Sequence, residues 1–200
     1  MQQIAKELAL KNATEKLKSI DIIKQCNLLH INIIEDKFAY LKIFGKSIKW
    51  DFNNFIFIDE DVNNLLSINE KILIYHYILN DKIHDNTNKL ISFRELQSGN
   101  FYYEPFLKRT IIPLVSKIQN NLNKLEENLN KYFIWEKLNM GDFAAKIKII
   151  QNIYIILVYY LSDDEFDTDA KIFFDESIKS IFCTEDIVVL SSMVCLKLIQ

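Results

Sequence analysis

The stretch SFRELQSGNFYYEPF, residues 92–106, is the part of this chain around which the rest is organised. The chain contains three glycines, two prolines and two arginines, yet one glycine, both prolines and both arginines lie between residues 92 and 113. Since every other basic side chain except histidine is a lysine, Arg94 and Arg109 indicate a need for the planar guanidinium. That group binds carboxylates and phosphates bidentately and stacks on rings. Gly99 indicates a turn with positive φ.

Arginine beside tyrosine is the usual composition of a binding hot spot. The candidate ligand-binding residues of this stretch and its continuation are Arg94, Glu95, Tyr102, Tyr103 and Arg109. A structural alternative explains the same residues: Arg94 and Glu95 form local ion pairs while the aromatic rings close the core. From the sequence we favour this alternative, because structural ion pairs and functional sites share the same composition.

Composition favours one cytoplasmic domain spanning residues 1–200. A chain of 200 residues, 50% of them hydrophobic, can bury one substantial core. The net charge is −3 and the lysines form no block, which argues against DNA or RNA as a partner. The longest apolar run, residues 153–161, is far shorter than the roughly 20 residues that span a bilayer, so we expect no membrane partner. Residues 1–7 lack the pattern of a signal peptide.

Periodicity predicts helices and a meander in the first half of the chain. Apolar residues at spacings of three and four predict an N-terminal helix over residues 2–20. The spacing then changes to two and predicts a three-stranded antiparallel meander over 28–52, with a further short strand at 55–58. A capping box at 67–70 opens a helix through residue 79 that is apolar nearly all round, which indicates a buried central position.

The clearest periodicity of the second half lies in residues 111–129, where apolar residues are spaced 4, 3, 4, 3 and 4. This spacing predicts one long amphipathic helix lying across a sheet, with Thr110 as its cap and Pro113 in its first turn. A coiled-coil homodimer through the same stripe is the alternative.

Two more strands and a helix are expected after this. Alternation predicts a strand at 143–149 with one exposed face, and an unbroken apolar run predicts a strand at 153–161 covered on both faces. A short strand at 171–175 and a helix capped by Thr184 follow. The sequence therefore predicts an α+β fold: antiparallel sheet or sheets, with an N-terminal helix, a buried central helix, a long amphipathic helix and a C-terminal helix.

Residues 162–169 form an acidic loop with five carboxylates. Asp164, Glu165 and the later Asp175 are candidates for binding Mg²⁺ or Ca²⁺, because these cations prefer oxygen ligands. The spacing does not match an EF-hand loop, and no glycine lies nearby to turn the chain. We therefore favour a solvated loop with a carboxylate paired to one of the arginines, such as Glu165 or Asp175 with Arg94.

His76 lies among apolar residues of the predicted central helix. A lone histidine in this setting is most often a hydrogen-bonded core residue, and a role as proton shuttle or axial ligand is the alternative. Neither the scattered His30, His76 and His84 nor the three cysteines, which form no CxxC pair, predict a metal site. The identity of any cofactor stays unknown.

Catalytic motifs are absent from the sequence. It contains no G-x-S-x-G elbow, no phosphate-binding glycine loop and no H-E-x-x-H pair. With three glycines in all, the backbone cradles that hold nucleotide phosphates cannot be built in the usual way. The sequence leaves enzyme activity uncertain and favours a non-catalytic protein.

Four pieces of the chain carry a further signal: residues 73–79, 92–106, 141–142 and 164–186. In this order they resemble the domain-of-unknown-function 3786 family of anaerobic bacteria and archaea. The similarity covers about residues 65–190, and Gln97 stands where we would expect a proline. Some relatives carry an iron–sulfur module, for which the cysteines of this chain lack the spacing. The resemblance implies a single domain and an anaerobic setting, and it implies no activity.

We therefore expect a non-catalytic accessory domain in an anaerobic cofactor or redox pathway, binding a small molecule or a protein partner. Its pocket or docking surface would be lined by Arg94, Tyr102, Tyr103 and His76. The alternatives are a carboxylate-dependent, metal-assisted enzyme using residues 163–175, and a structural homo-oligomer formed through the predicted long helix. The site hypotheses depend on the arginines and rings meeting the acidic loop in three dimensions.

Overall fold

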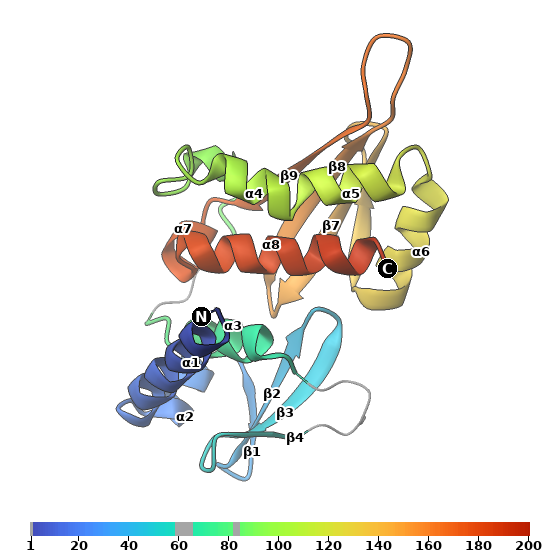
Figure 1. Ribbon diagram of the computed structural model, residues 1–200. Helices are drawn as coiled ribbons and strands as arrows, with labels where there is room; N and C mark the ends of the chain where they lie inside the picture. Colours follow the sequence, from blue (N-terminus) through green and yellow to red (C-terminus); the bar gives the residue numbers. More distant parts are fainter. Residues whose placement is uncertain (1, 59–65, 82–84) are drawn as a thin grey trace. The chain divides into compact units, whose positions relative to one another are not determined.

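The computed structural model describes residues 2–58, 66–81 and 85–200 (Figure 1). The chain forms two compact units, Met1–Asp85 and Asn86–Gln200, which we call unit 1 and unit 2. Each unit combines helices with antiparallel strands, which confirms the predicted α+β class. Organisation as a single domain stays a prediction. In the described parts of the chain, no helix is long and apolar enough to cross a bilayer.

The described part of unit 1 contains two helices, a four-stranded meander and a third helix. Its elements are α1 (Gln2–Lys18), α2 (Ile22–Leu28), β1 (Asn32–Ile34), β2 (Phe38–Ile43), β3 (Lys46–Asp51), β4 (Ile56–Ile58) and α3 (Ile68–Ile78). Consecutive strands pair antiparallel. Helix α2 was not predicted: the Asp21 side chain caps it by accepting a hydrogen bond from the Lys24 N–H. The first strand therefore begins later than residue 28.

The core of unit 1 forms where α3 packs on the sheet. The ring centroids of Trp50 in β3 and Tyr75 in α3 lie 5.6 Å apart, and both side chains are buried. Ile74 of the same helix is fully buried. Lys46 Nζ lies 3.0 Å from Glu70 Oε1, which joins the start of α3 to β3. Helix α3 is therefore buried, as the sequence predicts.

We expect Ser67→Ala to lower the free energy of unfolding of unit 1 by about 1 kcal/mol. The variant removes one half of a capping box: Ser67 Oγ accepts from the Glu70 N–H at 3.3 Å, while Glu70 Oε2 accepts from the Ser67 N–H at 2.8 Å. Urea unfolding followed by Trp50 fluorescence, in a Trp135→Phe background, measures the change. Ser47→Ala, at an exposed position of β3, is the control, and equal losses in both variants would contradict the capping role.

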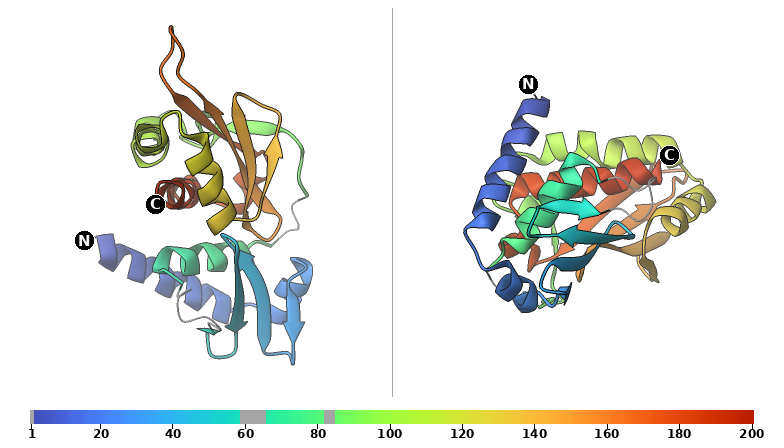
Figure 2. Two further views of the ribbon diagram at one scale, coloured as in Figure 1. Left: turned by 90° about the vertical axis from the view of Figure 1, so that its right-hand side faces the viewer. Right: turned by 90° about the horizontal axis from the view of Figure 1, so that it is seen from below.

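Unit 2 is a five-stranded antiparallel sheet with helices, in strand order β6-β7-β8-β9-β5. Helices α4, α5 and α8 cover one face of this sheet (Figure 2, left). Strand β5 and the short helix η2 belong to the stretch 92–106 and its lead-in. The elements are β5 (Leu90–Ser92), η2 (Phe93–Glu95), α4 (Tyr103–Arg109), α5 (Ile111–Ile118), α6 (Leu122–Tyr132), β6 (Trp135–Leu138), β7 (Phe143–Ile150), β8 (Ile153–Tyr160), β9 (Asp169–Asp175), α7 (Ile178–Ile181) and α8 (Thr184–Leu198).

Strand β8 is the buried centre of this sheet. It pairs with β7 on one side and β9 on the other, and residues 153–159 are all buried. The predicted cover on both faces is therefore confirmed. The single exposed face predicted for β7 is wrong in part, because both Ala144 and Ala145 are fully buried and Tyr154 and Val158 cluster with Ala144. Lys148 of β7 stays exposed.

The predicted long helix over residues 111–129 is in fact two helices, α5 and α6. Gln119 ends α5 with a left-handed φ of 50°, and the Tyr159 hydroxyl of β8 donates to its carbonyl oxygen at 2.9 Å. Asn121 then caps α6, since its side chain accepts a hydrogen bond from the Lys124 N–H. Asparagine side chains compete for backbone groups and favour caps over helix interiors, which explains the break.

The apolar stripe of these two helices is nevertheless used for packing. Four of its six residues, Ile111, Ile118, Leu125 and Leu129, are buried, and the other two, Val115 and Leu122, are partly buried. A buried stripe offers no exposed seam to a second chain, so the coiled-coil alternative loses its basis.

Neither of the two predicted threonines makes a capping hydrogen bond with its side chain, although Thr110 stands at the predicted N-cap position of α5. Thr110 Oγ1 donates to the Phe106 carbonyl oxygen at 2.6 Å, inside the junction of α4 and α5. Thr184 Oγ1 donates to the Gln97 carbonyl oxygen at 2.7 Å, and Cys183 occupies the N-cap position of α8. The Thr110 bond runs back to the preceding turn, a local alternative to capping that threonine often adopts. The Thr184 bond joins residues 87 positions apart, which local sequence does not reveal.

Candidate functional site

The stretch 92–106 begins as a capped turn. Glu95 Oε2 accepts hydrogen bonds from the Ser92 N–H at 2.7 Å and from Ser92 Oγ at 2.9 Å. These bonds lower the pKa of the Glu95 carboxyl. The Glu95 carboxylate is therefore directed back at its own turn, and the expected Arg94–Glu95 ion pair does not form between these two described residues.

Gly99 is required for space and not for a positive φ, which corrects the prediction. The left-handed residue of this turn is Ser98, with φ 58°. A Cβ on Gly99 would lie 2.1 Å from the Phe93 carbonyl oxygen and 3.0 Å from that of Leu96. The Gly99 N–H also donates to the Leu96 carbonyl oxygen at 2.9 Å, so the turn closes tightly on its own backbone.

Two buried rings anchor the turn to α4. Phe93 and Phe106 stack with centroids 4.0 Å apart, and both are buried. The Tyr103 ring lies 6.3 Å from Phe106, and the Arg94 guanidinium carbon lies 4.0 Å from the Tyr103 centroid. The need for a planar guanidinium that the sequence suggests is therefore met at Arg94 by stacking on a ring.

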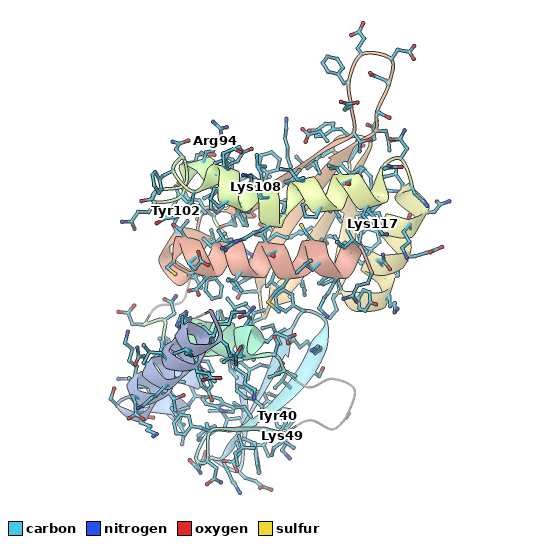
Figure 3. The ribbon with its side chains drawn as sticks, viewed as in Figure 1. Tyr40, Lys49, Arg94, Tyr102, Lys108 and Lys117 are labelled. Atoms are coloured by element: carbon cyan, nitrogen blue, oxygen red, sulfur yellow. The ribbon has the colours of Figure 1, made fainter. Side chains whose placement is uncertain are left out.

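The rings at the tip of the turn face solvent. Phe101 is 80% exposed and Tyr102 is 45% exposed, and their rings meet edge to face at 5.1 Å. Arg94 and Tyr102 lie at the same end of the helix layer (Figure 3). We call Arg94, Phe101, Tyr102 and Tyr103 the aromatic–arginine surface. Phe101 was missing from the predicted site, although its place directly after Gly99-Asn100 indicates a projecting tip.

Arg109 does not join this surface. Its Nη1 lies 3.2 Å from Glu185 Oε1, which links α4 to the first turn of α8. Both side chains are well exposed, and an exposed pair of this kind contributes little stability. Its placement in the predicted binding site stays a prediction without a contact to support it.

The acidic loop projects from the sheet of unit 2 as the tip of the β8–β9 hairpin (Figure 1). Asp163 Oδ1 accepts hydrogen bonds from the Glu165 N–H at 2.9 Å and the Phe166 N–H at 2.8 Å, which lower the pKa of the Asp163 carboxyl. Asp164 and Glu165 are exposed, and Phe166 is 70% exposed. Within the described ranges, no three His, Cys, Asp or Glu side chains are grouped as metal ligands would be.

The arginines and the acidic loop do not meet. In unit 2 the hairpin tip lies at the opposite end of the α4–α5 layer from Arg94 (Figures 1 and 3). Of the described residues, neither Glu165 nor Asp175 forms an ion pair with Arg94. The expected convergence is therefore wrong, and with it goes the geometric basis for a carboxylate-dependent active site.

Asp175 belongs to the structure of unit 2 and not to the acidic tip. Its two oxygens accept from the Thr87 N–H at 3.0 Å, the Thr87 hydroxyl at 3.0 Å, the Asn88 N–H at 2.8 Å and the Ser177 N–H at 2.9 Å. Burial raises the pKa of Asp175, but these hydrogen bonds outweigh it and lower the pKa to about 2. Asp175 thus holds Thr87 and Asn88 against the end of β9.

His76 lies in α3 of unit 1, while the aromatic–arginine surface lies in unit 2. The grouping of the two stays a prediction. His84 lies outside the described residues. Cys26 and Cys195 are buried, and burial raises the pKa of each thiol to about 12, which disfavours the thiolate that binds metals.

Fold and site together define an α+β protein with an exposed surface of arginine and aromatic side chains. The chain belongs to the family described as a domain of unknown function, DUF3786, whose model matches residues 21–197. No curated protein and no solved structure matches it. The match confirms the family that the sequence resembles and extends the matched region, predicted as about residues 65–190, to most of unit 1. The anaerobic setting stays a prediction.

Proposed function

We propose that this protein is a non-catalytic protein-binding domain and that the aromatic–arginine surface of unit 2 is its docking surface. The observation that carries the proposal is the exposure of Phe101, at 80%, beside the half-exposed Tyr102. Fully burying a side chain such as phenylalanine contributes about 1.5–3 kcal/mol, so a partner that covers these rings recovers free energy that the isolated chain leaves unused. Tyrosine and arginine are among the residues most enriched in interface hot spots.

The scaffold behind this surface is ordered by contacts that do not involve a partner. The Phe93–Phe106 stack is buried, the Glu95 carboxylate is bound to Ser92, and Gly99 fits against the Phe93 carbonyl group. Binding to a surface held in this way costs little conformational entropy.

A protein partner fits these residues better than a small molecule. Small-molecule sites are concave and enclose most of their ligand, whereas a phenylalanine as exposed as Phe101 projects outward. An open hollow in unit 1 is lined in part by Ile20, Asp21 and Lys24, and it contains none of the predicted site residues. The family resemblance is the only support for a further proposal, that the partner belongs to an anaerobic cofactor or redox pathway.

A photo-crosslinking amino acid in place of Phe101 tests the docking surface. In a native extract of the source cells we expect a discrete adduct, at least tenfold weaker when Arg94→Ala and Tyr102→Ala are added, since hot-spot losses of about 2 kcal/mol weaken binding about 30-fold. The same cross-linker at Leu196, exposed on α8, is the control. Identical adducts from both positions, or an adduct unchanged by the two alanines, would sink the proposal.

A further inference from the structure

We infer that the partner of the aromatic–arginine surface is a second copy of this chain, which docks the acidic tip of its β8–β9 hairpin, residues 163–167. The inference rests on the proposed function and names the partner. Two features of unit 2 carry it: the complementary chemistry of the tip and the surface, and their positions at opposite ends of one helix layer.

The tip offers what the surface lacks. Asp164, Glu165 and Asp167 are exposed acids, and Phe166 between them is 70% exposed. On the surface, Arg94 has its guanidinium on the Tyr103 ring and has no ion pair with any acid in the described parts of the chain. When the tip docks, its carboxylates can pair with the Arg94 guanidinium while the Phe166 ring packs on the exposed rings of the surface. Each side then gains a partner that its own chain does not supply.

The charged side chains close to the aromatic–arginine surface do not occupy Arg94, so its guanidinium is available to a partner. Glu95 is the nearest acid in sequence, and its carboxylate is bound to Ser92. Glu104 is exposed in the first turn of α4 and opposes an acidic ligand, while Lys108 of the same helix is an exposed cation (Figure 3). Rings and a single guanidinium therefore provide the attraction, and the overall field is close to neutral.

The hairpin is held away from the surface of its own chain. Asn120 Oδ1 accepts from the Ser162 N–H and from Thr168 Oγ1, each at 3.0 Å, and its Nδ2 donates to Ser162 Oγ at 2.8 Å. Asp142 Oδ2 accepts from the Leu161 N–H at 2.8 Å on the adjacent strand end. These hydrogen bonds hold both strands of the hairpin at its base. The tip therefore projects from the sheet and is ordered before it binds.

The arrangement of unit 2 allows the contact to close as a dimer. The hairpin rises from the sheet beside one end of the α4–α5 layer (Figure 1), and Arg94 lies on the same side at the other end (Figure 3). A two-fold rotation of a second copy above this side places each tip over the surface of the other copy. Both contacts then form at once, which gives a closed, isologous pair and not a filament.

Light scattering after size exclusion, on the full chain over the micromolar range, tests the inference. We expect a dimer for the wild-type protein and monomers for two charge reversals made separately, Arg94→Glu and Asp164→Lys with Glu165→Lys. Each reversal should weaken association at least 30-fold. Glu127→Lys, an exposed reversal on α6, is the control and should leave the dimer intact.

A mixture of the two charge-reversal variants is the decisive experiment. In the mixed pair, one contact joins the wild-type surface to the wild-type tip, and the other joins Glu at position 94 to the two new lysines. Both contacts are attractive, so the mixture should dimerise although neither protein does so alone. A dimer that survives Arg94→Glu, or a mixture that stays monomeric, would overturn the inference.

The outcomes also separate this inference from the proposed function. A monomeric wild-type chain overturns the second copy as partner, and the extract adduct at position 101 then decides alone whether the surface docks another protein. In the purified protein, the cross-linker at position 101 should give a dimer adduct that maps to residues 163–167. An adduct that maps elsewhere counts against the hairpin as occupant.

Discussion

Asp175→Asn is expected to lower the free energy of unfolding of unit 2 by about 2 kcal/mol at neutral pH. The folded-state pKa of about 2, against an ordinary 3.8, corresponds to about that stabilisation. Asparagine removes the charge and replaces one acceptor by a donor, which leaves the N–H groups of Thr87, Asn88 or Ser177 without their partner.

The pH dependence has a definite sign. Because folding lowers the pKa of Asp175, its contribution to stability is fully present above the unfolded-state value and is lost as the pH falls from about 4 to about 2. The wild-type protein should therefore lose stability over this range more steeply than the Asp175→Asn variant.

Trp135 lies in β6 of unit 2 and Trp50 lies in unit 1, so a Trp50→Phe background makes fluorescence a reporter of unit 2 alone. Urea titrations at pH 7 and at low pH give both parts of the prediction. Asp167→Asn is the matched control, since this carboxylate is exposed and lies in the acidic loop. A loss at Asp175 no larger than that at Asp167 would show that the buried hydrogen bonds do not contribute as argued.

Gly99→Ala is expected to cost unit 2 about 3 kcal/mol, at the upper end for inserting a methyl group into a packed site. The new Cβ would lie 2.1 Å from the Phe93 carbonyl oxygen, and that oxygen belongs to the backbone of the turn and cannot rotate away. The turn must open, which separates Arg94 from Tyr103 and disorders the aromatic–arginine surface. Cross-linking from position 101 should fall together with stability.

Ser98→Gly distinguishes this cause from backbone strain. Ser98 holds φ 58°, where glycine is favoured, so this variant should be neutral or more stable by up to about 1 kcal/mol. If Gly99→Ala were harmless, or if Ser98→Gly were the damaging change, the close approach to Phe93 would not be what requires glycine. The same urea titration followed by Trp135 fluorescence measures both variants.

Several features could be predicted because they depend on residues close in sequence. Alternation and apolar runs predicted the meander of unit 1 and the doubly covered strand β8. The capping box of Ser67 and Glu70 spans three residues and was predicted with its partners. Composition alone pointed to the stretch 92–106, where Arg94 and Tyr103 do meet.

The features that were predicted wrongly depend instead on residues far apart in the sequence. Periodicity in residues 111–129 continues through the break, because the stripe packs inward on both sides of Gln119 while the hydroxyl that holds this break comes from Tyr159. Thr184 was expected to cap its own helix, yet its hydroxyl donates to the carbonyl oxygen of Gln97, 87 residues away.

The sequence by itself determined the class of fold, most of the segments and the stretch that forms the exposed surface, since local spacing decides which faces are apolar and which turns are capped. Tertiary structure alone decided which long-range partner each polar group takes: Thr87 and Asn88 for Asp175, Glu185 for Arg109, Gln97 for Thr184. Such choices depend on which backbone donors and carbonyls the packed sheet and helices bring together, and a linear pattern carries no record of that.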